Sequence, residues 1–185
     1  PYAGYAYACE RRLEAVMFRE LRRKNQQLSE TEARSILKNG TYGVLSVQGD
    51  DGYPYGVPMN YVYGDDAIYF HCAKEGHKME SFQRSDKVSF CVVGEDEVIP
   101  EAFSTAYASV IVFGRASVVT DEKEKREALK LLAERFSPEY TKEGEAAIES
   151  SWNDVCVVRL KIEHAAGKAG MERIKREEAR YASFL

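Results

Sequence analysis

Six short runs rich in Val, Ile, Tyr and Phe, most of them bounded by Gly or Asp, constrain this chain most strongly. They are TYGVLSV (41–47), YGVPMNYVY (55–63), AIYFHC (67–72), KVSFCVV (87–93), SVIVFGRASVV (109–119) and VCVVRLKI (155–162). Residues of these types favour strands. The intervening QGDDGYP and YGDD are turn sequences, so we expect the first three strands to form an antiparallel meander in which neighbours pair.

Two helices are predicted between and before these runs. Ser29 followed by Glu32 forms a capping box, which predicts a short helix ending at Asn39-Gly40. Asp121 caps a second helix that joins the fifth strand to the sixth and stops before Pro138. Helical spacing gives this second helix an apolar face made of Ala128, Leu131, Leu132 and Phe136.

Many neighbouring strands with few helices between them argue against a doubly wound parallel sheet. Closing an antiparallel sheet into a barrel removes its exposed edges, so we predict a mainly β fold: a six-stranded antiparallel barrel with peripheral helices. A length of 185 residues suits one domain, which we place at residues 17–185 and which ends in a charged helical tail. Residues 1–16 alternate small and aromatic residues without a period, and we interpret them as an N-terminal extension or a cloning remnant.

Charge and composition exclude several classes of function. The net charge is −4 and the basic residues are scattered among acids, so we expect no nucleic-acid or membrane partner. No apolar run has the roughly 20 residues that cross a bilayer, and the chain does not start like a signal peptide, so we expect a cytoplasmic protein. The four cysteines lie far apart with no CxxC pair, which predicts reduced, mostly buried thiols and no metal site: Cys9, Cys72, Cys91 and Cys156.

The stretch IYFHCAKEGHKMESF, residues 68–82, places polar residues where a strand gives way to a helix. Free backbone amides at the start of a helix favour an anion, so Gly76, His77 and Lys78, with Lys74 nearby, could hold a phosphate. A solvated loop explains the same charges equally well. His71 on the strand is more often a structural histidine than a catalytic one, and the local sequence does not decide between the two.

The order of the pieces is more specific. PYGVPMNY, YFHCAKEGHK and SVIVFGRA follow one another as in the pyridoxamine 5'-phosphate oxidase-related flavin proteins, which the chain resembles over residues 17–168. Within that group it is most similar to the nitroimidazole-resistance (Nim) branch. The resemblance implies an FMN-binding split β-barrel that forms a homodimer, with one FMN per active site at the subunit interface.

The resemblance also implies roles for particular residues. In the family the flavin ring lies along the second strand, which is here Val57, Pro58, Met59 and Asn60. The phosphate is held after the third strand, here by Lys74, Gly76, His77 and Lys78. The dimer mate contributes from Ser109 and its neighbours, and His71 matches the histidine that Nim-like proteins place beside the flavin, where we expect it to be catalytic. Trp152 lies near the last strand, where relatives close the pocket.

Three functions follow from the resemblance. The first is an FMN-dependent oxidoreductase that takes electrons from a reduced donor and passes them to a small acceptor such as a nitroimidazole or another nitroaromatic. The second is a pyridoxamine 5'-phosphate oxidase-like enzyme, although the chain lacks the terminal Trp and Arg of those enzymes and runs into its charged tail instead. The third is a non-enzymatic split barrel that binds flavin or haem, with His71 or His164 as the axial ligand of a haem.

Overall fold

The computed structural model describes residues 18–183, so the predicted N-terminal extension and Cys9 lie outside the described part. The strands are β1 (Tyr42–Gln48), β2 (Pro54–Asn60), β3 (Val62–Gly64), β4 (Ala67–Ala73), β5 (Lys87–Ile99), β6 (Ser104–Val118) and β7 (Val155–Ala169). The helices are α1 (Glu30–Asn39), α2 (His77–Arg84), α3 (Glu122–Phe136), α4 (Thr141–Ser151) and α5 (Met171–Ala182), with short 3-10 turns η1 (Lys24–Gln26), η2 (Asp50–Gly52) and η3 (Pro100–Ala102).

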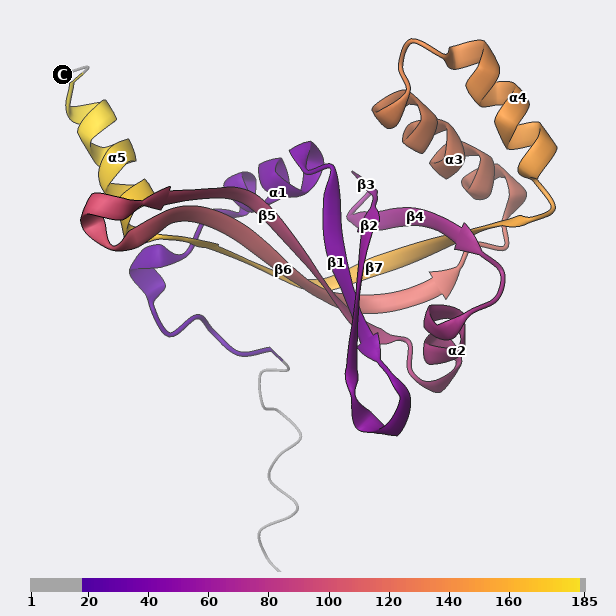
Figure 1. The fold of residues 1–185 in the computed structure, drawn as a ribbon, viewed down its shortest axis with the longest axis horizontal. Helices are drawn as coiled ribbons and strands as arrows, with labels where there is room; N and C mark the ends of the chain where they lie inside the picture. The colour runs from indigo at the N-terminus through magenta and orange to yellow at the C-terminus, as the bar shows by residue number, and fades with distance from the viewer. Residues whose placement is uncertain (1–17, 184–185) are drawn as a thin grey trace, which may run out of the picture.

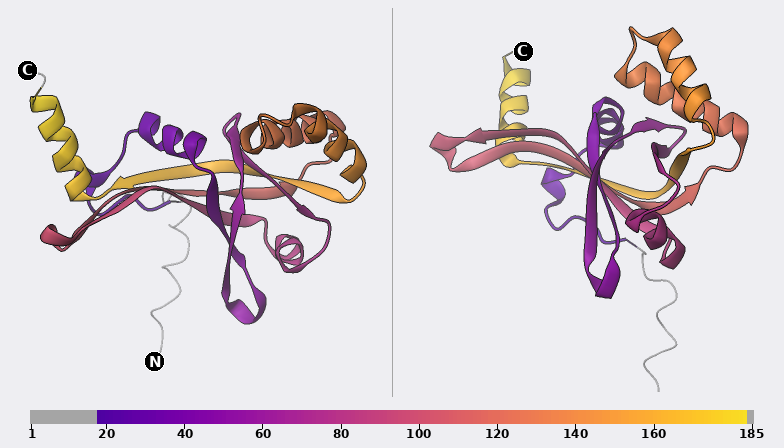
Figure 2. Two further views of the ribbon diagram at one scale, coloured as in Figure 1. Left: turned by 45° about the horizontal axis from the view of Figure 1, so that its top comes forward. Right: turned by 45° about the vertical axis from the view of Figure 1, so that its right-hand side comes forward.

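One antiparallel sheet contains all seven strands, in the order β2-β1-β5-β6-β7-β4-β3. The two end strands, β2 and β3, are consecutive in the chain and are separated only by Tyr61. The sheet therefore curls until its ends meet at that residue, and no ladder of backbone hydrogen bonds joins them there. This is the predicted mainly β split barrel, with α1, α3, α4 and α5 on one side of the long strands and α2 on the other (Figures 1 and 2).

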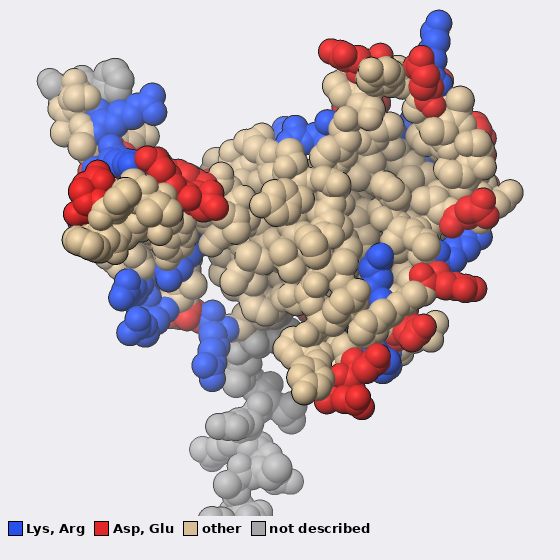
Figure 3. Space-filling model, in the orientation of Figure 1, with Lys and Arg blue, Asp and Glu red and all other residues tan. Residues whose placement is uncertain are grey.

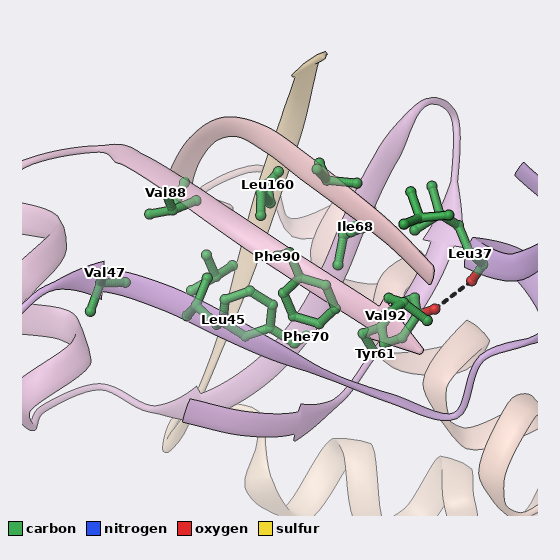
Figure 4. Packing of buried hydrophobic residues seen from close by; sticks show 14 of the residues in the cluster. Leu37, Leu45, Val47, Tyr61, Ile68, Phe70, Val88, Phe90, Val92 and Leu160 are labelled. Atoms are coloured by element: carbon green, nitrogen blue, oxygen red, sulfur yellow. Dashed lines mark hydrogen bonds between the residues drawn. The ribbon is translucent and has the colours of Figure 1, made fainter. Parts of the chain in front are cut away.

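The strand count and the pairing of the first strands differ from the prediction. We expected six strands and a meander of the first three, but the run 55–63 divides into β2 and β3, which pair with different neighbours. Tyr61 divides it because its side chain is 1% exposed and its hydroxyl donates a hydrogen bond of 2.7 Å to the Leu37 carbonyl (Figure 4). A residue anchored in the core in this way turns the chain from one end of the sheet to the other.

The main core fills the barrel with alternating side chains of the strands. Along β5, Val88, Phe90 and Val92 are buried while Ser89 and Cys91 are half-buried, which confirms the predicted alternation. The Phe90 ring packs edge-on against Tyr61, with ring centroids 5.0 Å apart. The largest fully buried residues of this cluster are Leu37, Leu45, Tyr61, Ile68, Phe70, Phe90, Val92, Val110, Val112, Val158 and Leu160 (Figure 4).

Both predicted helices are present with their caps. The Ser29 and Glu32 capping box is complete at α1, and the Asp121 carboxylate accepts from the Glu124 amide at α3. The predicted apolar face of α3 was partly wrong, because Leu131 is 46% exposed and Phe136 is 37% exposed. The helix instead buries Ala128, Leu129 and Leu132 in a second cluster with strands β3, β4 and β7 and with α4, a helix that the sequence analysis did not predict.

Strands β5 and β6 continue beyond the barrel, and α5 packs beside this extension at the end of the molecule opposite α3 and α4 (Figure 1). Arg173 joins Glu95 at 3.0 Å, and Arg176 joins Glu97 at 3.0 Å through its second guanidinium nitrogen. The predicted charged tail is therefore helical and held by ion pairs. Across residues 18–183, no helix has the combination of length and apolar composition that spanning a bilayer requires.

Candidate active site

Strand β2 offers free backbone groups to a ligand. It ends the sheet and pairs with β1 alone, so the hydrogen-bonding groups on its other edge have no strand partner. Pro58 lies in the middle of β2, faces outward, and has no N–H to offer, a position that suits a proline on an edge strand. Val57 and Met59 are half-buried on the opposite face, and Asn60 is exposed with its amide donating to the Thr41 carbonyl at 2.8 Å.

His71 lies near the end of β4, where the strand emerges from the core. Residues Ala67 to Phe70 are buried, whereas His71 is exposed. His71 and Asn60 line one cavity of about 540 Å³, so the structure brings together these two sequence-predicted residues from different strands. Helices α3 and α4 supply most of its wall, which consists of Leu129, Leu132, Ala133, Phe136, Ser137, Tyr140, Glu143, Gly144, Ala147, Ile148, Ser151 and Val155.

The sequence analysis missed this helical wall. The Phe136 side chain, assigned there to the apolar face of the helix, lines the cavity, and no element was predicted for the residues of α4. A usable signal was present, since Tyr140, Gly144, Ala147, Ile148 and Ser151 recur at spacings of three or four residues, which is the period of one helix face. That signal reveals a helix but does not reveal that the helix faces His71.

The start of α2 presents the amides expected of an anion site. Gly76 has a φ of +118° and is the N-cap residue of the helix. It makes no side-chain hydrogen bond to the backbone amides of the first turn, so no side-chain cap occupies these amides. Lys74 is exposed and Lys78 is half-buried beside this turn. Two ammonium groups and free amides are the donor set that suits a phosphate, and the residues present therefore fit the phosphate of a flavin nucleotide.

His77 has partners that the sequence did not predict. Its ring stacks on Tyr55 of β2, with centroids 4.2 Å apart and planes 13° apart. Its Nε2 atom lies 3.4 Å from an Asp50 carboxylate oxygen, and Asp50 also pairs with Arg84 at 2.8 Å. The contacts place the start of β2 against the start of α2, and they orient the imidazole toward Asp50. The predicted contact of His77 with a phosphate stays a prediction.

Ser109 lies in a different part of the chain from His71. It is on the outer face of β6, in register with Val93 of β5, and shares that face with Ile111 and Phe113, which are 42% and 39% exposed. Ser109, Ile111 and Phe113 line a second cavity of about 650 Å³ together with His164. The His164 ring stacks on Phe18, with centroids 4.8 Å apart. Within one subunit, Ser109 and His71 therefore line two different cavities.

Trp152 is held away from that cavity. It packs against the second core cluster, and Lys125 and Arg126 lie over its ring at 4.4 Å and 4.6 Å from the ring centroid. Lys125 also donates a hydrogen bond of 2.7 Å to the Trp152 carbonyl. These contacts fix the junction of α3 with the end of α4.

Known proteins share the fold of this chain. The family model described as pyridoxamine 5'-phosphate oxidase matches residues 29–169. A search of curated proteins finds no significant match. Among solved structures, a candidate 5-nitroimidazole antibiotic resistance protein from Bacteroides thetaiotaomicron is 23% identical with a TM-score of 0.63, and the match covers 77% of this chain and 86% of that one.

Two further structures are similar. A FAD-binding protein from Mesorhizobium loti is 25% identical with a TM-score of 0.57, covering 78% of this chain and 97% of that one. A FAD- and haem-binding protein from Mycobacterium smegmatis is 21% identical with a TM-score of 0.67, covering 82% and 80%. Identities this low establish a shared fold, and they leave the ligand of this chain to be argued from its own residues.

Proposed function

Because the chain belongs to the pyridoxamine 5'-phosphate oxidase family, we propose that it is an FMN-dependent oxidoreductase that reduces small acceptors such as nitroimidazoles and other nitroaromatics. The observation that carries the proposal is the apolar cavity onto which His71 and Asn60 open. An exposed histidine that lines a mainly apolar cavity is the arrangement expected where a small aromatic molecule is bound and protonated.

The lining of the cavity favours an uncharged acceptor over pyridoxamine phosphate. Glu143 is the one Asp, Glu, Lys or Arg among its lining residues, and apart from His71 and Asn60 the rest of the wall consists of aliphatic, aromatic and small side chains. A substrate phosphate needs cationic or amide donors, and a carboxylate beside it would repel it. Nitroaromatics need a flat apolar wall and one proton donor, which Leu132, Phe136 and His71 provide.

Each part of the site has a separate role in this proposal. Bound FMN would supply the two-electron chemistry. Lys74, Lys78 and the amides after Gly76 hold the phosphate, and the free edge of β2 along Val57–Asn60 meets the polar edge of the ring. The His71 imidazole donates a hydrogen bond or a proton to the oxygen of the acceptor, while the α3–α4 wall excludes water from the acceptor's apolar side.

The proposal includes a homodimer in which Ser109 of one subunit completes the site of the other. The outer face of β5 and β6 supports it, since Val93, Ile111 and Phe113 are 52%, 42% and 39% exposed in the single chain. Figure 3 shows that the middle of one broad face of the molecule carries few charged side chains, which gather at its periphery. A patch of this kind is typical of a surface that a second copy covers.

The test combines a spectrum with two variants. Protein as purified, or reconstituted with FMN, should show the absorbance of an oxidised flavin. His71→Ala should keep that spectrum and lose about 10²–10⁴-fold in turnover of a nitroaromatic acceptor. His71→Gln keeps a hydrogen-bond donor but cannot transfer a proton, so activity between the two levels would assign the proton to His71. Turnover by His71→Ala equal to that of the wild type would contradict the catalytic role.

Haem binding is a second candidate, and one observation favours it. His164 lines the cavity of about 650 Å³ whose wall includes Phe18, Ile111 and Phe113, and an imidazole in an apolar cavity suits an axial ligand. The Mycobacterium smegmatis protein of the same fold binds both FAD and haem. Titration with haemin should then shift and sharpen the Soret band of free haemin, and His164→Ala should abolish this change while His71→Ala leaves it intact. A Soret band that stays that of free haemin in the wild type would remove this candidate.

A further inference from the structure

Two cysteines that are distant in sequence stand opposite each other in the sheet. The register of β4 with β7 pairs Cys72 directly with Cys156. Side chains of directly opposed residues in an antiparallel pair point to the same face, and their Cα atoms lie about 4.5–5.5 Å apart. Disulfides need a Cα separation of about 4.4–6.8 Å. The backbone therefore already holds the two residues at the spacing of a cross-strand disulfide.

The surroundings place both thiols on the inner side of the barrel wall. Cys156 is 6% exposed and belongs to the main core cluster, and Cys72 is half-buried against the same cluster. The Cys72 sulfur lies 3.7 Å from the Met79 sulfur of α2. Burial raises the pKa of the Cys72 thiol to about 11, and the Cys156 thiol adds to the shift in the same direction. The two thiols are thus near enough to interact, and the Cys72 thiol is protonated at neutral pH.

We propose that Cys72 and Cys156 form a reversible intramolecular disulfide that joins β4 to β7 when the protein meets peroxide. Peroxide oxidises the half-exposed Cys72 thiolate to a sulfenic acid, with water as the by-product after protonation. The Cys156 sulfur then attacks the Cys72 sulfur, the S–S bond forms, and the hydroxyl leaves as a second water. A dithiol reductant supplies the two electrons and two protons that restore both thiols. This inference does not depend on the proposed function.

The position of the cross-link gives it a structural effect. Side chains alternate along β4, so His71 points to the outer cavity and Cys72 points inward. A bond between Cys72 and Cys156 would fix the last residues of β4, next to His71 and just before the turn that leads into α2. Oxidation would therefore stiffen the strand that carries the site without occupying the site itself.

The experiment uses the full chain with Cys9→Ser and Cys91→Ser, which leaves only the proposed pair. Cys91 is a matched cysteine, because it is half-buried on β5 and has Val44 and Ile111, not a cysteine, as its neighbours across the sheet. After hydrogen peroxide, the intact mass should fall by about 2 Da, a peptide joining Cys72 to Cys156 should appear after digestion, and dithiothreitol should reverse both.

One further variant and a pH series test the disulfide independently. Adding Cys156→Ser should replace the loss of about 2 Da by gains of about 16 or 32 Da on Cys72, since no partner thiol remains. The rate of disulfide formation should rise about tenfold per pH unit between pH 7.5 and 9.5, because the thiolate is the attacking form. Two alkylatable thiols after peroxide, a disulfide only between chains, or oxygen added only at Met79 would each overturn the proposal.

Discussion

Tyr61 shows how one side chain determines the path of the whole sheet. It carries the hydroxyl that binds the Leu37 carbonyl, and its ring fills the space beside Phe90. Gly40 adjoins it so closely that an added Cβ would stand 2.5 Å from the Tyr61 hydroxyl oxygen, so no larger residue fits there without movement. Burial holds the pKa of Tyr61 well above its usual value, which makes its contribution to stability dependent on pH.

Tyr61→Phe should lower the free energy of unfolding at pH 7 by about 1–2 kcal/mol, because it removes a buried hydrogen bond. Above pH about 10 the unfolded chain releases this tyrosine proton while the folded chain keeps it. The unfolded state then binds fewer protons, so wild-type stability falls with pH by up to about 1.4 kcal/mol per unit from this group. Urea unfolding of both proteins at pH 7 and pH 10.5 should show the gap between them narrowing. A constant gap would contradict the shift.

Replacing the single residue Lys78 tests whether the start of α2 holds the FMN phosphate. Lys78→Ala should weaken FMN by about ten- to hundred-fold, since a hydrogen bond to a charged group contributes about 1.5–3 kcal/mol. Riboflavin, which has no phosphate, should bind both proteins equally. Lys123→Ala, on a side chain that is 85% exposed on α3, is the control and should change neither affinity. Equal losses for both flavins would mean damage to the fold, and no loss would mean a solvated loop.

Features of the candidate site that depend on residues adjacent in sequence could be predicted, whereas contacts between distant segments could not. The spacing of Gly76, His77 and Lys78 at a strand-to-helix junction revealed a turn with free amides, and the structure contains it. The pairing of His77 with Asp50 and Tyr55 could not be read from that spacing, because the β1–β2 turn meets α2 only through the tertiary fold. Local sequence therefore predicted the turn and its helix start, whereas it did not predict the groups that surround His77.

At the scale of helices and strands, the helix caps and the alternation of buried and half-buried residues along β5 were predicted correctly. The capping box at α1 and the Asp121 cap at α3 rest on contacts within a few residues, which is why the sequence contained them. The opposition of Cys72 and Cys156 depends on the register of two strands that are separated in sequence by β5, β6 and three helices. The spacing of the cysteines in the sequence therefore did not predict a dithiol pair, although the sheet places two cysteines opposite each other.

Ser29→Ala should lower the free energy of unfolding by about 0.5–2 kcal/mol, because the Glu32 amide then loses its side-chain acceptor. The Glu32 carboxylate also loses the Ser29 hydroxyl donor, which lies 2.6 Å away. Thr31→Ala, exposed in the same helical turn, is the matched control and should change stability by less than about 0.5 kcal/mol. Urea denaturation of the three proteins compares them directly, and equal stability of both variants would show that the cap contributes nothing.

At the scale of the whole molecule, we predict that a charge on the outer face of β6 disrupts the proposed homodimer. Ile111→Arg places a charge on the outer face of β6 and should convert a dimer into a monomer in sedimentation equilibrium, with a parallel loss of FMN binding. Leu131→Arg is the matched control, because Leu131 is 46% exposed on α3, close to the 42% of Ile111. A wild-type protein that sediments as a monomer with full flavin occupancy would contradict the shared site.

The order of the strands also governs how the protein can be made. Strand β4 is synthesised early, yet one of its two edges stays open until β7, the last strand, leaves the ribosome. Until then β4 and β6 both present unpaired backbone groups, which are templates for pairing between nascent chains. A message that terminates before β7 should therefore yield an aggregating fragment in place of a smaller barrel, and ribosomes that slow before β7 is complete would prolong the period in which the chain needs a chaperone.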